Sequence, residues 1–266
     1  MDVENELKVY YRELFPLQLL YETLEINGRR EVSFFTSTGS YMRYLTFDSA
    51  ELFREKLELV NPRKIDLGPV YDIKPSKSNG AVPVAREIVF DIDLTDYPRE
   101  CCKDKKICNL CYEKIKCAIN ILDYSLRTEF GFTSYGFVFS GRRGVHCWVL
   151  EMKELPTHVR NDIFKFFQNV VDKNLFVQEY NNIMGRYGDA DLVKNFFPRI
   201  DKQVTVSMNH LIKMPFSVHP DTFNISVPLD PNSITELEDI PTLSQAVASP
   251  AVLEPYYEVL KTWKRQ

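Results

Sequence analysis

Two aspartates stand two residues apart in an otherwise apolar stretch. The segment 87–94 reads EIVFDIDL, and its alternation of apolar and acidic residues predicts a strand with Asp91 and Asp93 on one face. Carboxylates this close repel unless a cation neutralises them, and Mg²⁺ and Mn²⁺ prefer oxygen ligands. The pair is a candidate part of a two-metal phosphoryl-transfer site. A solvated strand face with two surface aspartates is the alternative, and the spacing alone does not separate the two.

A glycine-bracketed basic turn is the second candidate. The sequence SGRRGVH (140–146) places Arg142 and Arg143 between two glycines, in a tight turn between apolar strands. Glycine lets a backbone approach a ligand closely, turn N–H groups bind anions, and arginine forks match phosphate oxygens. His146 lies where it could donate a hydrogen bond to a phosphate. A solvated hairpin tip with exposed arginines remains the alternative.

Four of the six cysteines fall within eleven residues: Cys101, Cys102, Cys108 and Cys111. Zinc takes four soft ligands tetrahedrally, and C-x-x-C is a common half-site. We favour zinc over four unligated buried thiols, and we expect its role to be structural because no open coordination position for catalysis is evident. The remaining two, Cys117 and Cys147, are expected to be core residues.

The elements that must position these groups follow from hydrophobic periodicity and turn residues. Helices are expected over 5–24 with a break or kink at Pro16, over 49–59 with Ser49 near the N-cap, over 108–130, within 157–195 and from 234 onward. Strands are expected over 31–35, 41–47, 87–94, 135–140, 145–150 and 224–229. The pattern predicts a mixed α/β (α+β) fold with a central sheet flanked by helices, rather than a simple alternating parallel sheet.

Composition is that of an ordinary globular protein. The 266 residues are 44% hydrophobic, enough for a sizeable core. A formal charge of -4 excludes a uniformly basic nucleic-acid binder, so any nucleic-acid contact needs a local basic patch. The sequence shows neither an apolar leader at its start nor a long apolar run, so we expect an intracellular protein without a membrane span.

Together these features resemble the DNA primase small-subunit family of eukaryotes and archaea. Four stretches carry the resemblance: NPRKIDLGPVY (61–71), VFDIDLTDY (89–97), FSGRRGVHCWV (139–149) and FPRIDKQVTVSMNHLIKMPFSVHP (197–220). The second, third and fourth stretches contain the acidic pair, the basic turn and a further aspartate. The tryptophan in the third stretch is similar to eukaryotic members.

The resemblance implies roles for individual residues. The metal-binding acids of the family fall on Asp91, Asp93 and Asp201. The residues that face the incoming nucleotide fall on Arg43, Lys64, Asp66, Ser140, Arg142, Arg143, His146, Lys213 and His219. The structural zinc ligands of the family fall on Cys101, Cys102, Cys108 and Cys111.

The resemblance also implies an activity: a primase catalytic subunit that makes short RNA primers on single-stranded DNA during replication, by two-metal nucleotidyl transfer from NTPs. The implied cofactors are two Mg²⁺ or Mn²⁺ ions and one structural Zn²⁺. The implied partners are the primase large subunit and the replicative DNA polymerase alpha complex, with a nuclear location. One catalytic domain over 1–266 is expected, with its zinc motif at 101–111.

One departure from the family concerns length. Family members usually carry a larger helical segment between the basic turn and the third aspartate, and here about 45 residues stand there. We expect a small helical segment at 151–196. Two other functions stay open: a non-catalytic nucleic-acid-binding subunit stapled by zinc, and a repair DNA polymerase of the same superfamily. The three acids argue against a non-catalytic subunit, and a preference for deoxynucleotides would indicate a repair polymerase.

Overall fold

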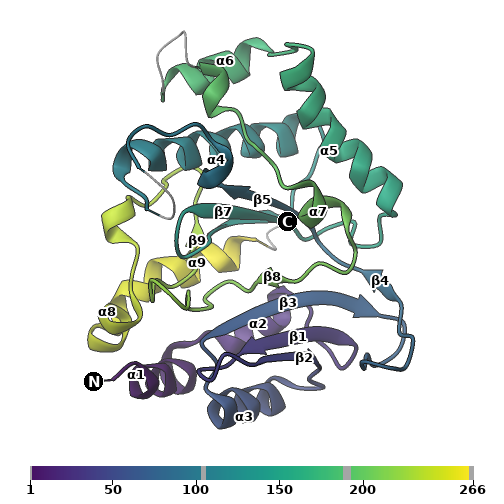
Figure 1. Ribbon diagram of the computed structural model, residues 1–266, viewed down its shortest axis with the longest axis vertical. Coiled ribbons are helices and arrows are strands. Elements are labelled where there is room, and N and C mark those ends of the chain that lie inside the picture. Colours follow the sequence, from purple (N-terminus) through teal and green to yellow (C-terminus); the bar gives the residue numbers. More distant parts are fainter. Residues whose placement is uncertain (1, 103–105, 188–192, 264–266) are drawn as a thin grey trace.

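The computed structural model describes residues 2–102, 106–187 and 193–263 (Figure 1). Its helices are α1 (Val3–Val9), α2 (Leu17–Thr23), α3 (Ala50–Val60), α4 (Asn109–Thr128), α5 (Thr157–Asp172), α6 (Gln178–Gly185), α7 (Lys202–Val206), α8 (Leu243–Ala248) and α9 (Glu254–Thr262). Its strands are β1 (Arg30–Phe35), β2 (Tyr41–Leu45), β3 (Lys64–Tyr71), β4 (Pro83–Ala85), β5 (Ile88–Asp93), β6 (Tyr135–Phe139), β7 (Gly144–Val149), β8 (Ile212–Lys213) and β9 (Pro228–Leu229). Short 3₁₀ turns follow β5 and precede α7, α8 and α9.

The strands form two antiparallel sheets. The first sheet has the order β2-β1-β3-β4, with β8 also paired to β3, and the second has the order β5-β7-β6-β9. The predicted mixed α/β class is confirmed, although the strands divide between two sheets instead of forming one central sheet. Figure 1 shows β8 on the side of β3 that faces the second sheet, and its pairing is with β3.

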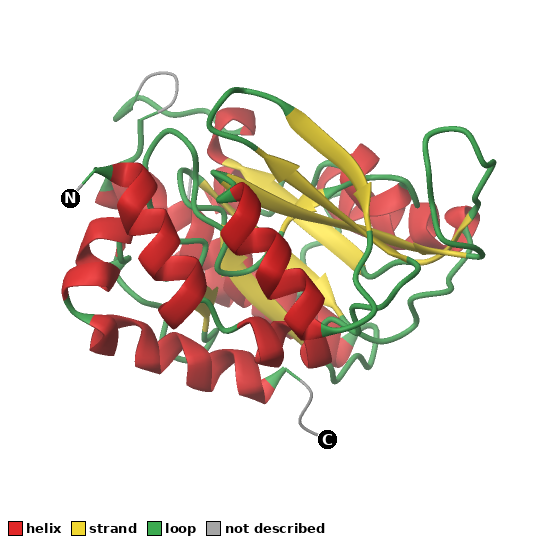
Figure 2. Cartoon of the chain, turned by 90° about the horizontal axis from the view of Figure 1, so that it is seen from below, coloured by secondary structure: helices red, strands yellow, loops and turns green. Residues whose placement is uncertain are grey.

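Helices cover the outer faces of the sheets. Phe53 of α3 stacks on Phe34 of β1, with ring centroids 6.0 Å apart. The view from below in Figure 2 shows helices in front of the strands, as this packing requires. On the other side of the molecule α4 packs against β7. One continuous cluster of buried apolar residues runs through both sheets, so the chain buries a single core.

Local signals explain most element boundaries. The first helical stretch is interrupted as expected: α1 continues as a π-helical turn over Tyr10–Leu14, and α2 begins after Pro16. Ser49 caps α3, because its hydroxyl accepts a hydrogen bond from the backbone N–H of Leu52.

The segment predicted to be helical at 151–196 contains α5, α6 and a 3₁₀ turn at Val193–Phe196, and residues 188–192 within it lie outside the described part. The strand predicted at 224–229 is shorter than expected, since only Pro228–Leu229 pair with β6. Across the described ranges, no helix combines the length and the apolar content needed to cross a bilayer.

Candidate active site

The acidic pair lies on β5 as its alternation predicts. Ile88, Phe90 and Ile92 are fully buried, while the side chains of Asp91 and Asp93 are 26% and 38% exposed. Because β5 pairs with β7, Asp91 lies opposite His146 and Asp93 lies opposite Gly144. The antiparallel register therefore places the basic turn directly beside the acids.

The third aspartate joins this pair through the backbone. The N–H of Asp201 donates to the carbonyl oxygen of Asp91 at 2.9 Å. The carboxylate of Asp201 also caps α7, where it accepts from the N–H groups of Gln203 at 2.6 Å and Val204 at 3.1 Å. Two residues 110 positions apart in the sequence are thereby fixed side by side.

Burial and neighbouring carboxylates together shift the pKa of Asp91. Burial, followed by the negative charges of Asp93 and Asp201, raises the pKa of Asp91 to about 7. Asp96, in the 3₁₀ turn after β5, also has a raised pKa, first from burial and then from the same two aspartates. A bound cation would relieve this repulsion, so the charge pattern suits a hard divalent ion.

The carboxylate of Asp93 already accepts several hydrogen bonds. Its Oδ1 accepts from Arg143 Nε at 2.7 Å and from the N–H and hydroxyl of Thr95, both at 2.8 Å. Burial alone would raise the pKa of Asp93, but these hydrogen bonds outweigh it and lower the pKa. The basic turn and the acidic strand are thus linked by an ion pair.

The turn needs both of its glycines. Gly141 has φ of +88°, and a Cβ added at Gly144 would lie 2.4 Å from the carbonyl oxygen of Ile92. The Ser140 hydroxyl accepts from the N–H of Gly144 at 3.0 Å and closes the turn. The result is a tight loop packed directly on β5.

Acids and bases meet at one cavity of about 210 Å³. Eight of the predicted site residues line it: Asp91, Asp93, Ser140, Arg142, Arg143, His146, Lys213 and His219. They come from β5, the basic turn, β7, β8 and the loop after β8. Sequence positions spread over about 130 residues therefore share one polar cavity.

Burial changes the pKa values of two side chains in this cavity, His146 and Lys213. Burial, and then the positive charge of Lys213, lowers the pKa of His146 to about 3, so its ring is neutral although Nε2 lies 3.6 Å from Asp91. We therefore treat that contact as polar and not as an ion pair. Burial also lowers the pKa of Lys213 to about 7, and its Nζ donates to the carbonyl of Ser140 at 2.6 Å. An entering anion favours the protonated amine.

Lys64 and Asp66 lie beside the cavity without lining it. Both are on β3, where Asp66 is opposite Lys213 of β8, and Lys64 Nζ lies 2.7 Å from Asp66. The hydroxyl of Tyr41 also donates to the Asp66 carboxylate. Arg43 is placed apart, because its Nε bonds at 2.6 Å to the buried carboxylate of Glu31.

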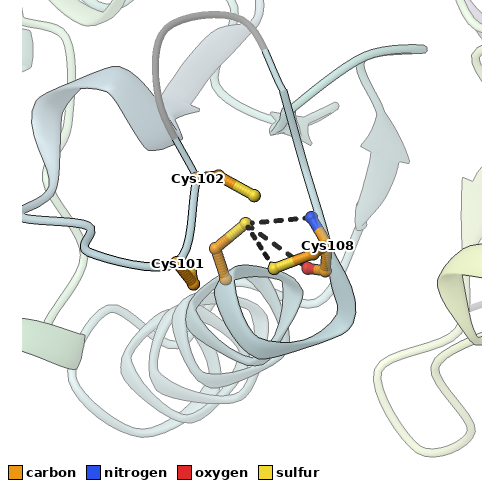
Figure 3. Close-up of side chains that lie close together, drawn as sticks. Cys101, Cys102 and Cys108 are labelled. Carbon is orange, nitrogen blue, oxygen red and sulfur yellow. Dashed lines mark hydrogen bonds between the residues drawn. The ribbon is translucent and has the colours of Figure 1, made fainter.

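The four predicted zinc ligands are brought together. The sulfurs of Cys101, Cys102, Cys108 and Cys111 all lie within 4.8 Å of one another at the start of α4 (Figure 3). The Cys108 and Cys111 sulfurs are 3.8 Å apart. A tetrahedral ion with Zn–S bonds of about 2.3 Å separates its sulfurs by about 3.8 Å, so this set fits zinc.

The four thiols differ in acidity: burial raises the pKa of Cys101, and a hydrogen bond with Cys108 raises the pKa of Cys102 to about 12. The N–H of Cys111 donates to the Cys108 sulfur and lowers the pKa of that thiol to about 7, which favours the thiolate that a metal needs. Residues 103–105 of this motif lie outside the described part of the chain. Cys117 and Cys147 are fully buried away from the cluster, as expected for core residues.

Within the described residues, the cysteines are the group of metal-type ligands gathered most closely. The three aspartates are near one another, but Arg143 and the N-terminus of α7 occupy oxygens of Asp93 and Asp201. A site for two ions about 3.5–4 Å apart also spans more space than a single-ion site. The oxygen donors fit Mg²⁺ or Mn²⁺ in type.

A comparison with known protein families matches the part of the chain that lines the cavity. The family model of the DNA primase small subunit matches residues 90–231, more than half of the chain. The chain belongs to the DNA primase small-subunit family. The matched range includes Asp91 and Asp93, the cysteine cluster, the basic turn and Asp201.

Named relatives extend the match over most of the chain. The DNA primase small subunit of Caenorhabditis elegans is 29% identical and covers 88% of this chain and 84% of its own length. The small subunit PriS of Pyrobaculum calidifontis is 27% identical, covering 90% and 80%. The C. elegans alignment runs over 343 residues although this chain has 266, so that relative carries insertions.

A solved structure shares the fold. The polymerase domain of Mycobacterium tuberculosis Ligase D, in complex with DNA, superposes with a TM-score of 0.54 over 96% of this chain and 92% of that one, at 13% identity. At this identity the likeness concerns the fold alone. Family membership and a polymerase-type fold together support a primase catalytic role.

The structure also adds residues that the sequence did not single out. Thr95 and Asp96 follow the acidic strand and contact or crowd its carboxylates. Asp221 and Thr222, directly after the SVHP stretch, contact the basic turn. The available signal was position: Thr95 and Asp96 lie within the stretch 89–97, and Asp221 and Thr222 directly follow the stretch 197–220.

Proposed function

We propose that this chain is the catalytic subunit of a primase that makes short RNA primers on single-stranded DNA from NTPs. The observation that carries the proposal is the shared cavity, which is lined by carboxylates on one strand and by arginines, a lysine and two histidines around it. Nucleotidyl transfer requires this combination, since the acids hold cations, the arginines and the lysine neutralise a polyphosphate, and the neutral histidines can donate hydrogen bonds to it.

The three aspartates would hold two Mg²⁺ or Mn²⁺ ions. When bound, such ions would supply Lewis-acid activation of the attacking 3′-hydroxyl and would offset the negative charge of the triphosphate. Arg143 would exchange its bond to Asp93 for the triphosphate, which frees a carboxylate oxygen. Lys213 would become fully protonated beside the phosphates, and neutral His146 would donate a hydrogen bond without adding charge.

The first sheet would complete the nucleotide site. Lys64 and Asp66 lie against Lys213, so they suit the sugar and the outer phosphates of the same nucleotide. Arg43 would reach a phosphate only by leaving Glu31. The zinc cluster would act structurally, by fixing the connection between β5 and α4.

Partners and location are proposed on family membership. A primase small subunit typically works with a large subunit and with the DNA polymerase alpha complex, and a nuclear location follows for a eukaryotic-type member. Because the charge of the chain is -4, we propose that it holds template weakly alone.

The test is incorporation of labelled ATP on single-stranded poly-dT, with Mg²⁺ or Mn²⁺, in one arm without primer and in one with an RNA primer. Wild-type protein should give metal-dependent RNA products in the primed arm at least. Asp93→Ala should lose roughly 10²-fold or more of that rate, because such charge interactions dominate phosphoryl transfer. Asp162→Asn, an exposed change on α5, serves as the charge-matched control.

Three results would overturn the proposal. DNA binding without incorporation in either arm indicates a non-catalytic subunit. Strict dependence on a primer together with a preference for dATP indicates a DNA polymerase with a primase-like fold. Full activity of Asp93→Ala would remove the acids from the mechanism.

A further inference from the structure

The segment 213–226 contacts successive residues of the basic turn. Lys213 Nζ donates to the Ser140 carbonyl at 2.6 Å, and the Thr222 hydroxyl donates to the Gly141 carbonyl at 2.6 Å. A Cβ added at Gly141 would lie 2.8 Å from the Cβ of His219. The conformation of the turn is therefore set partly from outside the turn.

Asp221 makes the contact with the arginine of this turn. Its Oδ2 lies 2.6 Å from Arg142 Nη1, and the side chain of Arg142 is only 18% exposed while that of Asp221 is 58% exposed. Arg142 lines the cavity but Asp221 does not. The Asp221 carboxylate thus binds the Arg142 guanidinium from the solvent side and leaves the cavity open to a ligand.

Asp221 is itself anchored. Its backbone N–H donates to His219 Nδ1 at 3.2 Å. Burial lowers the pKa of His219 to about 3, so the ring is neutral; with Nδ1 accepting, the ring proton lies on Nε2. Asp221 therefore contacts two cavity-lining side chains at once, one through its carboxylate and one through its backbone.

We propose that Asp221 is a positioning residue for the nucleotide triphosphate, acting by holding the Arg142 guanidinium in a phosphate-binding orientation. An arginine loses considerable rotamer freedom when it binds a ligand, and a carboxylate behind it removes part of that freedom beforehand. Two of its five N–H donors at most serve Asp221, so the rest of the fork stays available. This inference rests on the proposed function, because it concerns the same triphosphate.

The direction of the effect separates positioning from simple charge. Asp221 is negative and lies near a site for an anion, so removing its charge would by itself tighten nucleotide binding. Positioning predicts the opposite. Asp221→Asn is nearly isosteric and keeps the backbone N–H to His219, so it isolates the carboxylate.

The experiment measures primer extension and, separately, binding of a fluorescent ATP analogue by anisotropy, for wild type, Asp221→Asn, Asp221→Glu and the control Asp162→Asn. We expect Asp221→Asn to raise the KM for ATP and the Kd of the analogue about 3–10-fold with kcat within about twofold. Asp221→Glu should recover part of the loss, and Asp162→Asn should match wild type.

A double-mutant cycle with Arg142→Ala completes the test. The effect of Asp221→Asn should vanish in the Arg142→Ala background, since the two residues act through one contact. An unchanged or lower KM for Asp221→Asn, or an equal effect in both backgrounds, overturns the inference while wild-type activity still supports the proposed function. A wild-type chain that neither binds the analogue nor extends a primer overturns both.

Discussion

Replacing Asp91 by Asn should stabilise the metal-free protein at alkaline pH. Burial and the charges of Asp93 and Asp201 raise the pKa of Asp91 to about 7 from a usual 3.8. A carboxyl with a raised folded pKa prefers the folded state when protonated, so it destabilises the fold once both states are ionised. The destabilisation is absent below about pH 3.8, grows as pH rises toward 7 and is complete above it.

The magnitude follows from the same two values. Moving the pKa from 3.8 to about 7 corresponds to about 4 kcal/mol of folding free energy at pH 8. Relaxation of nearby side chains reduces this, so Asp91→Asn should gain about 2–4 kcal/mol at pH 8 and no more than about 1.5 kcal/mol at pH 5. The gain at pH 8 is large relative to the free energy of unfolding of a typical domain, which is about 5–15 kcal/mol.

Urea unfolding at both pH values measures the difference. Buffers are depleted of Mg²⁺ and Mn²⁺ by resin and not by a soluble chelator, so that a metal bound at the cysteine cluster would be left in place. Asp162→Asn controls for loss of one negative charge on the surface. Equal stability of Asp91→Asn and wild type at pH 8, or a gain that does not shrink at pH 5, would refute the argument that burial and neighbouring charge raise the pKa of Asp91.

Four further changes test the cysteine cluster, the basic turn and two ion pairs. Cys111→Ser should abolish binding of one zinc per chain and lower the Tm by several degrees, as measured by metal analysis and thermal unfolding, because the cluster fixes the start of α4. Arg143→Ala should raise the affinity for Mn²⁺ without nucleotide, measured by electron paramagnetic resonance, because it frees its partner carboxylate. Glu87→Gln should cost about 3–5 kcal/mol in urea unfolding, because it leaves Arg30 buried without its charge partner. Glu13→Gln, in an exposed ion pair, should change stability by less than ~1 kcal/mol.

The sequence predicts the elements that have a clear period. The strand carrying the acids and the long helix α4 were expected within one or two residues of their observed bounds. By contrast β3 was not expected, since Gly68 and Pro69 interrupt it and proline argues against an internal strand. Elements as short as α7 and β8 contain too few residues for any period to register.

The division into two sheets has a similar cause. Alternation reports which residues of a strand face the core, but it contains nothing about which strand lies beside it. Pairing of β5 with β7 and of β1 with β3 depends on contacts across long loops. A prediction from periodicity alone therefore joined all strands into one sheet.

The residues of the candidate site also differ in whether a local sequence pattern indicates them. The acidic pair and the basic turn are local patterns, and residue chemistry alone indicated both. Asp201 was predicted only through a family resemblance, because its proximity to Asp91 depends on a backbone hydrogen bond across 110 residues. The contact between Asp221 and Arg142 is likewise long-range, and no local pattern indicates it.

Because the cavity lies between the two sheets, contacts that hold the sheets together should affect both folding stability and ligand binding. Arg30 opens β1 in the first sheet, and Glu87 directly precedes β5 in the second, so their buried ion pair ties the sheets to each other. Lys213 makes a second tie, since β8 pairs with β3 while its Nζ reaches Ser140. Residues proposed to hold one nucleotide lie on both sheets, so a shift between the sheets changes their spacing. Loss of the Glu87 charge should therefore weaken nucleotide binding as well as folding, although this pair lies outside the cavity.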